Sequence, residues 1–501
     1  MKRFLSNVVQ WSAKRQMGNE VRSLFKSVRP QVEYLEAREL LSAPDWFSKY
    51  LPDAAVASLA RSDYADHGAI NFRDMLGIYN QIAADGSVAA SEYASLQSLA
   101  QNASVLNMPD YVSFLSTEVI DSTNPANSSF QGMSLPELGP GSPASTLQLL
   151  AGKWFLGADH PTVDEGGLTY STVRGTLFGS GGPSYLDVAQ GDAIDCWLMS
   201  SLATTAAQDS SVIQNMFIYD GTSHGIDIWT VRFFEDGSPV YVTVDNQLPM
   251  KDGSIVYDRP QGGVLWVALA EKAYAQLNEF GPNMTPSPGE NSYAALDQVA
   301  NGYQAMKTLS TLTGQEATAE GPGTTWTLIQ SGRPAVLLAS EPISPNLREQ
   351  HFYAAIDFDP STGHYTVYDP YGIQQGQADG KWGLFWANET FLHENFDYVV
   401  GGLGGGTKPT ERMPARAADP MLSEGLPLGN DSRSFTSARG AEKPAVAPPL
   451  LADAVFAGSK IPTSGDAVES LVHALSQDGD REGVQAVEFA RRMDSLFAVV
   501  G

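Results

Sequence analysis

The sequence contains a single cysteine, Cys196, in a segment whose pattern suits a nucleophile. The polar, Gly-containing stretch before it changes at Asp195 to a helical pattern. We therefore expect Asp195 or its neighbour to cap a helix and Cys196 to lie in the first turn. Unpaired N–H groups and the positive end of the helix dipole stabilise a thiolate there. They can also donate to an oxyanion, with the Gln190 amide as a second donor. The alternative is that Cys196 is a small buried apolar residue, as most lone cysteines are.

A cysteine nucleophile needs a histidine base, and the sequence has seven histidines. His351 and His364 begin two neighbouring predicted strands, and Asp369 ends the second strand. Suppose that Phe358 pairs with His364 across the turn. His351 is then opposite Tyr371, and Asp369 is its diagonal neighbour on the same face, close enough to orient the imidazole. A slip of one residue would place His351 and Asp369 on opposite faces. The alternative is a purely structural histidine beside an aspartate.

A helix followed by several antiparallel strands surrounds these residues. Alternating and β-branched positions predict strands, and apolar residues at helical spacing predict the helix. This order of elements predicts an α+β domain. The predicted elements are a hairpin of 226–234 and 240–245, a helix at 264–277, a buried strand at 334–340, and strands at 352–358 and 365–368.

Five segments in this region form a recognisable set. They are 190–198 (QGDAIDCWL), 242–253 (VTVDNQLPMKDG), 265–277 (LWVALAEKAYAQL), 351–353 (HFY) and 369–372 (DPYG). In this order they closely resemble the conserved segments of calpain-like cysteine proteases, bacterial-type relatives within the papain-type superfamily. The resemblance says nothing about residues 1–150 or 404–501.

The resemblance implies a cysteine endopeptidase that hydrolyses peptide bonds through a Cys-His-Asp triad. It also implies a papain-like core with a helical subdomain and an antiparallel β subdomain, and a protein or peptide as substrate. The implied roles are Cys196 as nucleophile, His351 as base, Asp369 as orienting residue, Gln190 and the Cys196 N–H as oxyanion hole, and Trp197 and Tyr371 as supporting residues.

Four positions depart from the family pattern. Asp369 replaces an asparagine, and a carboxylate holds an imidazolium at least as well because it is the stronger acceptor. Tyr371 replaces the tryptophan that shields this bond, and is a smaller lid. Ile194 and Gln350 replace glycines, and Ile194 needs room beside the substrate cleft. Two alternatives therefore stay open: a catalytically inactive calpain-like binding or scaffold module of a surface protein, and another papain-type activity such as acyl transfer or deamidation.

The resemblance also raises the question of calcium. Calpains bind calcium in the protease core partly through an aspartate three residues before the oxyanion glutamine, and Asp187 matches it. The partner glutamate is Val264 here, which cannot coordinate a cation. Acidic residues expected after 369–372 are largely missing from 373–381. We therefore expect a core that needs no cofactor or metal, with Asp187 as a weak calcium candidate.

Composition excludes several other classes of protein. The formal net charge is −26, and the sequence has no basic stripe that could contact phosphates. We therefore expect no nucleic-acid partner. One cysteine rules out an internal disulfide and thiolate-rich zinc sites. No run of 18 or more apolar residues is present, so we expect no membrane span.

The composition also suggests five regions. They are a basic leader or targeting-like segment (1–44), an all-α accessory domain (45–150), the protease domain (151–403), a flexible Gly/Pro-rich linker (404–460) and a C-terminal helical segment (461–501). The linker is a candidate substrate of the enzyme itself. Residues 35–42 (LEARELLS) resemble a segment near the start of large bacterial surface or secreted proteins. This resemblance suggests a location at the cell surface or outside the cell. The alternative is a basic amphipathic leader helix, and the protein could then be cytoplasmic.

Overall fold

The computed structural model describes residues 45–402 except 164–165, 260, 281–288, 298–301 and 374–379. Within the described residues the chain forms two compact units, one of 45–120 with 138–147 and one of 121–137 with 148–402. The expected leader at 1–44, linker at 404–460 and helical segment at 461–501 lie outside the described residues. These three regions therefore remain predictions.

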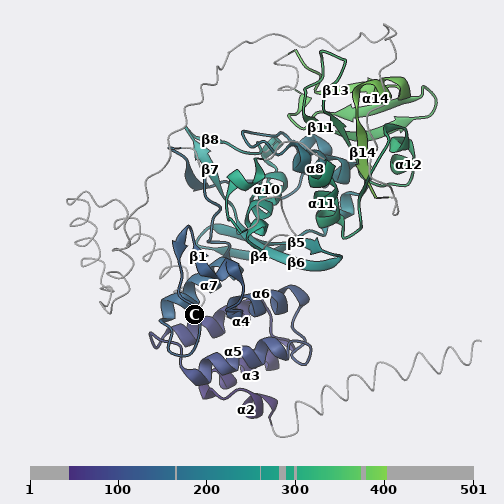
Figure 1. The fold of residues 1–501 in the computed structure, drawn as a ribbon. Coiled ribbons are helices and arrows are strands. Elements are labelled where there is room, and N and C mark those ends of the chain that lie inside the picture. The colour runs from purple at the N-terminus through teal and green to yellow at the C-terminus, as the bar shows by residue number, and fades with distance from the viewer. Residues whose placement is uncertain are drawn as a thin grey trace, which may run out of the picture. The chain divides into compact units, whose positions relative to one another are not determined.

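The first unit consists of short helices joined by capped turns (Figure 1). Asp53 accepts from the N–H groups of Ala55 and Val56 and so begins α3. Asn71 and Asp74 form a reciprocal capping box at the start of α4. The helices are α2 (Trp46–Tyr50), α3 (Ala54–His67), α4 (Phe72–Ala83), α5 (Ala90–Gln101) and α6 (Asp110–Ile120).

The second unit mixes helices and antiparallel strands, in agreement with the predicted α+β class. Its helices are α7 (Ala144–Leu156, of which 144–147 count with the first unit), α8 (Cys196–Gln208), α9 (Ser210–Gln214), α10 (Trp266–Leu277), α11 (Gly302–Thr313), α12 (Thr325–Gln330) and α14 (Glu389–Asn395). The predicted helix at 264–277 is confirmed as α10.

Three sheets carry most of this unit, together with a short β1–β2 ribbon (Ser129–Phe130, Met133–Ser134). One sheet is β4 (Phe217–Ser223), β5 (Ile226–Glu235) and β6 (Ser238–Asp245), and a second is β3 (Thr169–Thr172), β7 (Gln247–Lys251) and β8 (Ser254–Ile255). The third has the order β13-β12-β11-β10-β14-β9, with β9 (Thr318–Glu320), β10 (Ala335–Ala339), β11 (His351–Asp359), β12 (His364–Tyr368), β13 (Leu384–Ala387) and β14 (Tyr398–Gly401). The predicted β5–β6 hairpin and buried strand β10 are confirmed.

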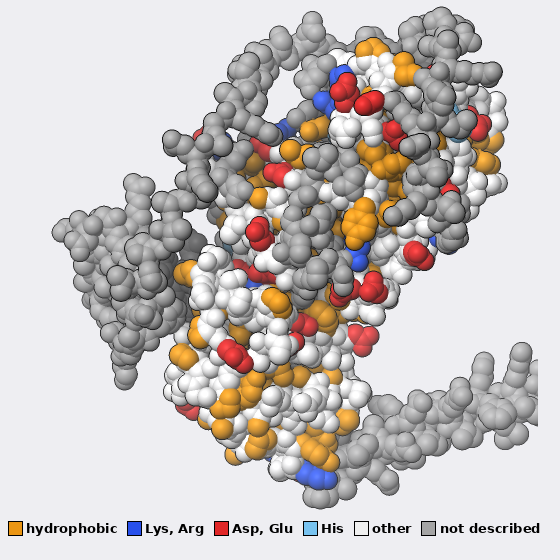
Figure 2. Space-filling model, viewed as in Figure 1, with side chains coloured by type: hydrophobic (Ala, Val, Ile, Leu, Met, Phe, Trp, Pro, Cys, Tyr) orange, Lys and Arg blue, Asp and Glu red, His pale blue; other side chains and the backbone are white. Residues whose placement is uncertain are grey.

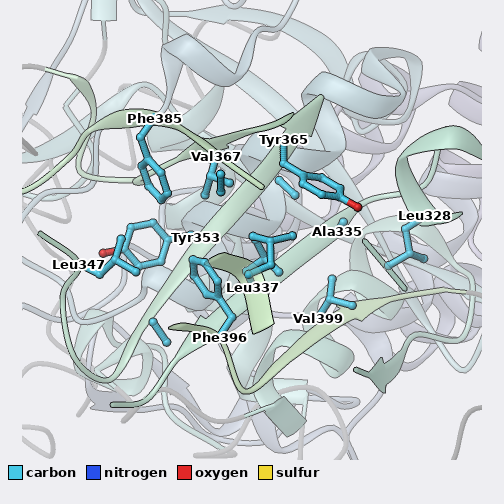
Figure 3. Packing of buried hydrophobic residues seen from close by; sticks show 14 residues of the cluster. Leu328, Ala335, Leu337, Leu347, Tyr353, Tyr365, Val367, Phe385, Phe396 and Val399 are labelled. Atoms are coloured by element: carbon cyan, nitrogen blue, oxygen red, sulfur yellow. The ribbon is translucent and has the colours of Figure 1, made fainter. Parts of the chain in front are cut away.

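A buried apolar cluster fixes β11 in the six-stranded sheet (Figure 3). Tyr353 lies at its centre, edge-on to Phe385 and Phe396 with ring centroids 6.0 and 5.7 Å away. Leu328 of α12 and Leu392 of α14 belong to the same cluster. Because Tyr353 is only two residues from the start of β11, this packing also fixes the position of the strand's first residue.

The register of β11 and β12 differs from the prediction at the turn. Asp359, not Phe358, pairs with His364, so the predicted pairing is wrong by one residue. Asp359 closes the turn itself, because its carbonyl accepts from the Gly363 N–H at 2.8 Å and its carboxylate from the Ser361 N–H at 2.8 Å. Gly363 supports this turn with φ of 72°.

A β-bulge then compensates for the shifted turn. The ladder runs Phe358–Tyr365 near the turn, but beyond the bulge Ala355 pairs with Val367 and Ala354 with Tyr368. Ile356 is the extra residue. Beyond the bulge, the start of β11 therefore has the predicted pairing, which puts His351 and Asp369 on the same face of the sheet.

Helix α8 holds this bulge through two side chains. The Thr204 hydroxyl donates to the Ala355 carbonyl at 2.9 Å, and the Gln208 amide donates to the Ile356 carbonyl at 2.6 Å. The Thr204 hydroxyl also accepts from the Ala335 N–H of β10 at 2.9 Å. The helix that begins at Cys196 is thus bonded directly to the strand that begins at His351.

On the face drawn in Figure 2, Asp and Glu side chains occur at many places, some singly and some side by side, with Lys and Arg in a few small groups. This distribution accords with the formal net charge of −26. In the described part of the chain, none of the helices combines the length and apolar character that crossing a membrane requires.

We predict that Thr204→Val destabilises the protein by about 1–3 kcal/mol, because the buried Ala335 N–H loses its acceptor. The neighbouring Thr205→Val is a matched control, since Thr205 is buried in the same helix and its hydroxyl has no hydrogen-bond partner. It should leave the free energy of unfolding unchanged or slightly higher. Urea denaturation measures both, and equal stabilities for the two variants would contradict the role of Thr204.

Candidate active site

Cys196 is the first residue of α8, as the sequence pattern predicts. It is the only cysteine of the chain and is 2% exposed. The first N–H groups of a helix have no partner within the helix, so the Cys196 N–H is directed to the space before the first turn. A thiolate or an oxyanion at this position would face these N–H groups and the positive end of the helix dipole.

Asp195 occupies the N-cap position, as expected for Asp195 or its neighbour, but its side chain makes no capping bond. The side chain is instead fully buried. Burial, and then the charge of Glu271, raise the pKa of Asp195 well above its ordinary value. In its neutral form Asp195 adds no negative charge beside Cys196, so it does not oppose a thiolate there.

The structure brings His351 and Asp369 together. His351 Nε2 lies 3.1 Å from Asp369 Oδ1, and the two side chains are 7% and 0% exposed. Burial alone lowers the pKa of His351, but interactions with Cys196 and Asp369 outweigh it and raise the pKa to about 9. Because Nε2 faces Asp369, Nδ1 is the ring nitrogen left for the Cys196 side chain, with which His351 also interacts.

Asp369 is held by three donors. Its Oδ1 accepts from His351 Nε2 and from the Tyr371 N–H at 3.0 Å, and its Oδ2 accepts from Arg348 Nε at 3.1 Å. Burial raises the pKa of Asp369, but His351, the Tyr371 N–H and Arg348 together lower it below its ordinary value. Asp369 is therefore an ionised carboxylate that fixes the orientation of the imidazole.

Aromatic rings cover the imidazole on two sides. Tyr371 stacks on His351 with a centroid distance of 5.4 Å and an interplanar angle of 13°. Tyr353 meets the imidazole edge-on at 5.0 Å. Trp197, the other expected supporting residue, packs against Tyr274 in the core at 5.6 Å. Tyr371 thus covers the imidazole ring, while Trp197 packs into the core at the start of α8.

Gln190 lies buried in the loop that leads to Cys196. Its Nε2 donates to the Ala193 carbonyl at 2.8 Å, which fixes the amide plane and leaves its second N–H for another acceptor. A Cβ at Gly191 would lie 1.8 Å from the Tyr257 carbonyl oxygen. Only glycine fits this close approach, so Gly191 sets the path of the loop that carries Gln190.

Ile194 lies two residues before Cys196, and its side chain is 49% exposed. Its N–H donates to Asp297 Oδ1 at 2.7 Å, which holds the backbone at this point. The half-exposed side chain does not fill the protein interior. It is therefore exposed at the surface, two residues before Cys196 in the chain.

The expected calcium position is occupied by Asp187 and Val264. Asp187 Oδ2 accepts from the Trp266 indole N–H at 2.7 Å and from the Ser184 N–H at 2.8 Å. Val264, in the position of the partner ligand, is buried and carries no side-chain oxygen. In the described residues, no set of three or more His, Cys, Asp or Glu side chains is placed to hold a metal.

Arg348 was not predicted as a site residue, but it contacts Asp369 and lies over the Tyr371 ring, 4.6 Å from its centroid. The only signal was a basic residue shortly before the predicted base strand. A second histidine–aspartate pair, His160 and Asp245 at 2.9 Å, also escaped prediction. Burial lowers the pKa of His160 despite Asp245, and the only thiol of the chain is already placed beside His351.

Comparison with known proteins gives a partial match to one protease family. Residues 171–353 match the family described as calpain family cysteine protease. This segment contains Cys196 and His351 and ends before Asp369. The resemblance predicted from the five sequence segments is thereby confirmed, and a calpain-like cysteine peptidase is the class of protein that it supports.

The similar curated proteins are calpains. The calpain-2 catalytic subunit of Bos taurus is 32% identical over 103 residues, or 20% of this chain and 15% of that protein. Calpain-8 of Homo sapiens is 33% identical over 100 residues, which cover 20% and 14% of the two chains. The calpain-1 catalytic subunit of Bos taurus is 35% identical over 102 residues, which cover 19% and 14%. The matched region thus spans about 15% of the length of these relatives.

We predict that His351 stays protonated in the folded protein up to a pH of about 9. The pKa of His351 in the folded protein is above the ordinary value of 6.5. The His351–Asp369 ion pair therefore contributes its full stability below pH 6.5, and this contribution is lost as the pH rises through about 9. Asp369→Asn should lower the pKa by about one unit or more. NMR titration of the His351 ring, assigned with His351→Gln, measures both values, and a wild-type pKa at or below 6.5 would contradict the prediction.

Proposed function

We propose that this protein is a calpain-like cysteine endopeptidase that hydrolyses peptide bonds through Cys196, His351 and Asp369. The observation that carries the proposal is the His351–Asp369 contact of 3.1 Å beside the first residue of α8. The calpain-family match over 171–353 supports the same class of chemistry. Proteins or peptides are the corresponding substrates.

In the acylation step, the Cys196 thiolate attacks the carbonyl carbon of the scissile peptide bond. Negative charge develops on the carbonyl oxygen, and the Cys196 N–H and the second N–H of Gln190 are the donors suited to hold it. His351 gives its proton to the leaving amine as the C–N bond breaks. Asp369 keeps the ring in the orientation that this transfer needs.

In the deacylation step, water replaces the departed amine. Neutral His351 removes a proton from the water as its oxygen attacks the thioester carbonyl, and the same two donors stabilise the second oxyanion. The acid product leaves, and the thiolate–imidazolium pair forms again. Tyr371 shields the His351–Asp369 bond from water in both steps.

An active-site-directed epoxysuccinyl reagent tests this proposal. It should label the wild-type protein at Cys196 but not Cys196→Ser, because it needs an activated thiolate. Cys196→Ser and His351→Ala should each lower peptide hydrolysis by at least about 10³-fold, since the two groups act as a unit. Wild-type protein that is folded but neither labelled nor active would contradict the proposal.

One observation favours the alternative of a catalytically inactive binding or scaffold module. The half-exposed Ile194 side chain stands where the family has glycine, next to the nucleophile. Ile194→Gly distinguishes the two functions, because a gain of hydrolysis limited to large substrates indicates an enzyme with a narrowed cleft. An Ile194→Gly variant that still fails to react with the epoxysuccinyl reagent supports the inactive module. Peptide cleavage compared with amine incorporation separates hydrolysis from acyl transfer.

We further propose that the protease core works without calcium. Asp187 is occupied by donors, and its expected partner position is Val264. Hydrolysis should therefore be the same in a chelator and in millimolar calcium. Asp187→Asn is expected to lower stability, because it weakens the contacts to Trp266 and Ser184, without creating or removing a calcium effect. Activation by calcium that Asp187→Ala abolishes would contradict this proposal.

The 404–460 linker stays a candidate substrate of the same site, although it lies outside the described residues. Its Gly- and Pro-rich sequence is the composition that leaves a chain accessible to a protease.

A further inference from the structure

Arg348 joins the two residues that surround the base. Its Nε donates to Asp369 Oδ2 at 3.1 Å, and its guanidinium lies 4.6 Å from the centroid of the Tyr371 ring. Its backbone N–H donates to the Tyr353 hydroxyl at 2.7 Å. Among the described residues, Tyr353 and Tyr371 are the aromatic rings that contact His351. Arg348 therefore reaches the carboxylate and both aromatic neighbours of the imidazole without being assigned to the triad itself.

The charges at the site explain why a cation is needed there. A thiolate at Cys196 and an imidazolium at His351 sum to zero, and a buried Asp369 carboxylate adds one negative charge. An uncompensated charge in a buried site is costly, whereas a hydrogen-bonded pair is tolerated. The Arg348 side chain is only 18% exposed and bonds Asp369 directly, so it supplies the missing positive charge. A neutral asparagine at position 369 would not need this positive charge.

The stacking order adds a geometric role. The Tyr371 ring contacts both the Arg348 guanidinium, 4.6 Å from its centroid, and the His351 imidazole, whose centroid is 5.4 Å away. A guanidinium over an aromatic face is an attractive contact. It holds the Tyr371 ring in the place where that ring stacks on the imidazole.

We propose that Arg348 is a positioning residue for the His351–Asp369 pair: it neutralises Asp369 and clamps Tyr371 over the imidazole. The consequence for peptide hydrolysis rests on the proposed function. The electrostatic role does not, because it concerns the thiol and the imidazole whether or not a peptide is cleaved.

Alkylation of Cys196 by iodoacetamide tests this role without a substrate, since the chain has no other thiol. The rate as a function of pH has an upper step at which His351 loses its proton. Removing a nearby positive charge favours the imidazolium, so Arg348→Gln should move this step upward by about 0.5–1 pH unit. Arg348→Lys keeps the charge and should stay near the wild type. An Arg348→Gln step equal to that of the wild type would overturn the proposal.

The matched control is Arg232→Gln. Arg232 lies over the Phe234 ring at 5.2 Å, a similar cation–π contact, but it belongs to β5 in another sheet. Its removal should leave the alkylation profile unchanged. A shift as large as that of Arg348→Gln would mean that the profile reports general loss of charge or stability, and would overturn the specific role.

The strongest test combines Arg348→Gln with Asp369→Asn. Arg348→Gln should lower hydrolysis about ten-fold in the wild-type background, because the base and its lid lose their support. In the Asp369→Asn background the same change should lower hydrolysis much less, since no carboxylate remains to be neutralised and only the contact with Tyr371 is lost. A residue that only stabilises a loop would harm both backgrounds equally, and that result would overturn the proposal.

Failure of the proposed function gives a different pattern. Suppose that Cys196 of the wild type is alkylated, that the upper step of the profile is shifted in Arg348→Gln, and that the wild type cleaves no peptide. The endopeptidase assignment is then wrong, and the role of Arg348 stands. In that case the alkylation profile of the Asp369→Asn, Arg348→Gln double variant replaces hydrolysis, and its upper step should return toward the wild type. A Cys196 thiol that reacts only after unfolding overturns both inferences.

Discussion

Side chains alternate between the two faces of a strand, so the first residue of β11 and the residue after β12 can meet only in one register. The turn at 360–363 sets the wrong one, because it pairs Asp359 with His364. Continued without interruption, that register would send His351 and Asp369 to opposite faces of the sheet. Ile356, the extra residue of the bulge, shifts the ladder by one and puts them on the same face. The His351–Asp369 contact thus depends on a local irregularity that α8 holds in place.

Two buried aspartates near the nucleophile show how partners decide charge. Asp195 and Asp369 are both fully buried, and burial alone raises the pKa of each. Asp195 faces the carboxyl group of Glu271, so its pKa rises further and the neutral acid is favoured. Asp369 faces His351 and Arg348, so its pKa is lowered and the carboxylate is favoured. The same residue type is therefore favoured as a neutral acid beside Cys196 and as a carboxylate beside His351.

Local patterns predicted the parts of the fold that depend on local chemistry. The start of α8 at Cys196, the β5–β6 hairpin and helix α10 follow from polarity, alternation and helical spacing. The turn register could not be predicted, because the same turn residues are compatible with pairing from Phe358 or from Asp359. The failure of Asp195 to cap α8 has a tertiary cause, since its carboxyl group is buried near Glu271.

Arg348 was beyond prediction for a related reason. Its contacts join residues on either side of two strands, and such contacts have no periodic signature in the sequence. The family resemblance located Asp369 by its motif. It could not reveal which group balances the negative charge of an aspartate at a position where the family has asparagine. Departures from a family pattern therefore mark the places where the structure must supply a compensating group, and only the fold identifies that group.

The spans of α8 and β11 between the site and the bulge explain why Cys196 and His351 lie at the same end of the two elements. Both elements start at the site, and they meet again where Thr204 bonds Ala355 and Gln208 bonds Ile356. A helix that rises about 1.5 Å per residue covers about 18 Å from Cys196 to Gln208. A strand that advances about 3.3 Å per residue covers about 17 Å from His351 to Ile356. Because the two spans agree, fixing the helix to the strand at the bulge also brings their first residues level with each other.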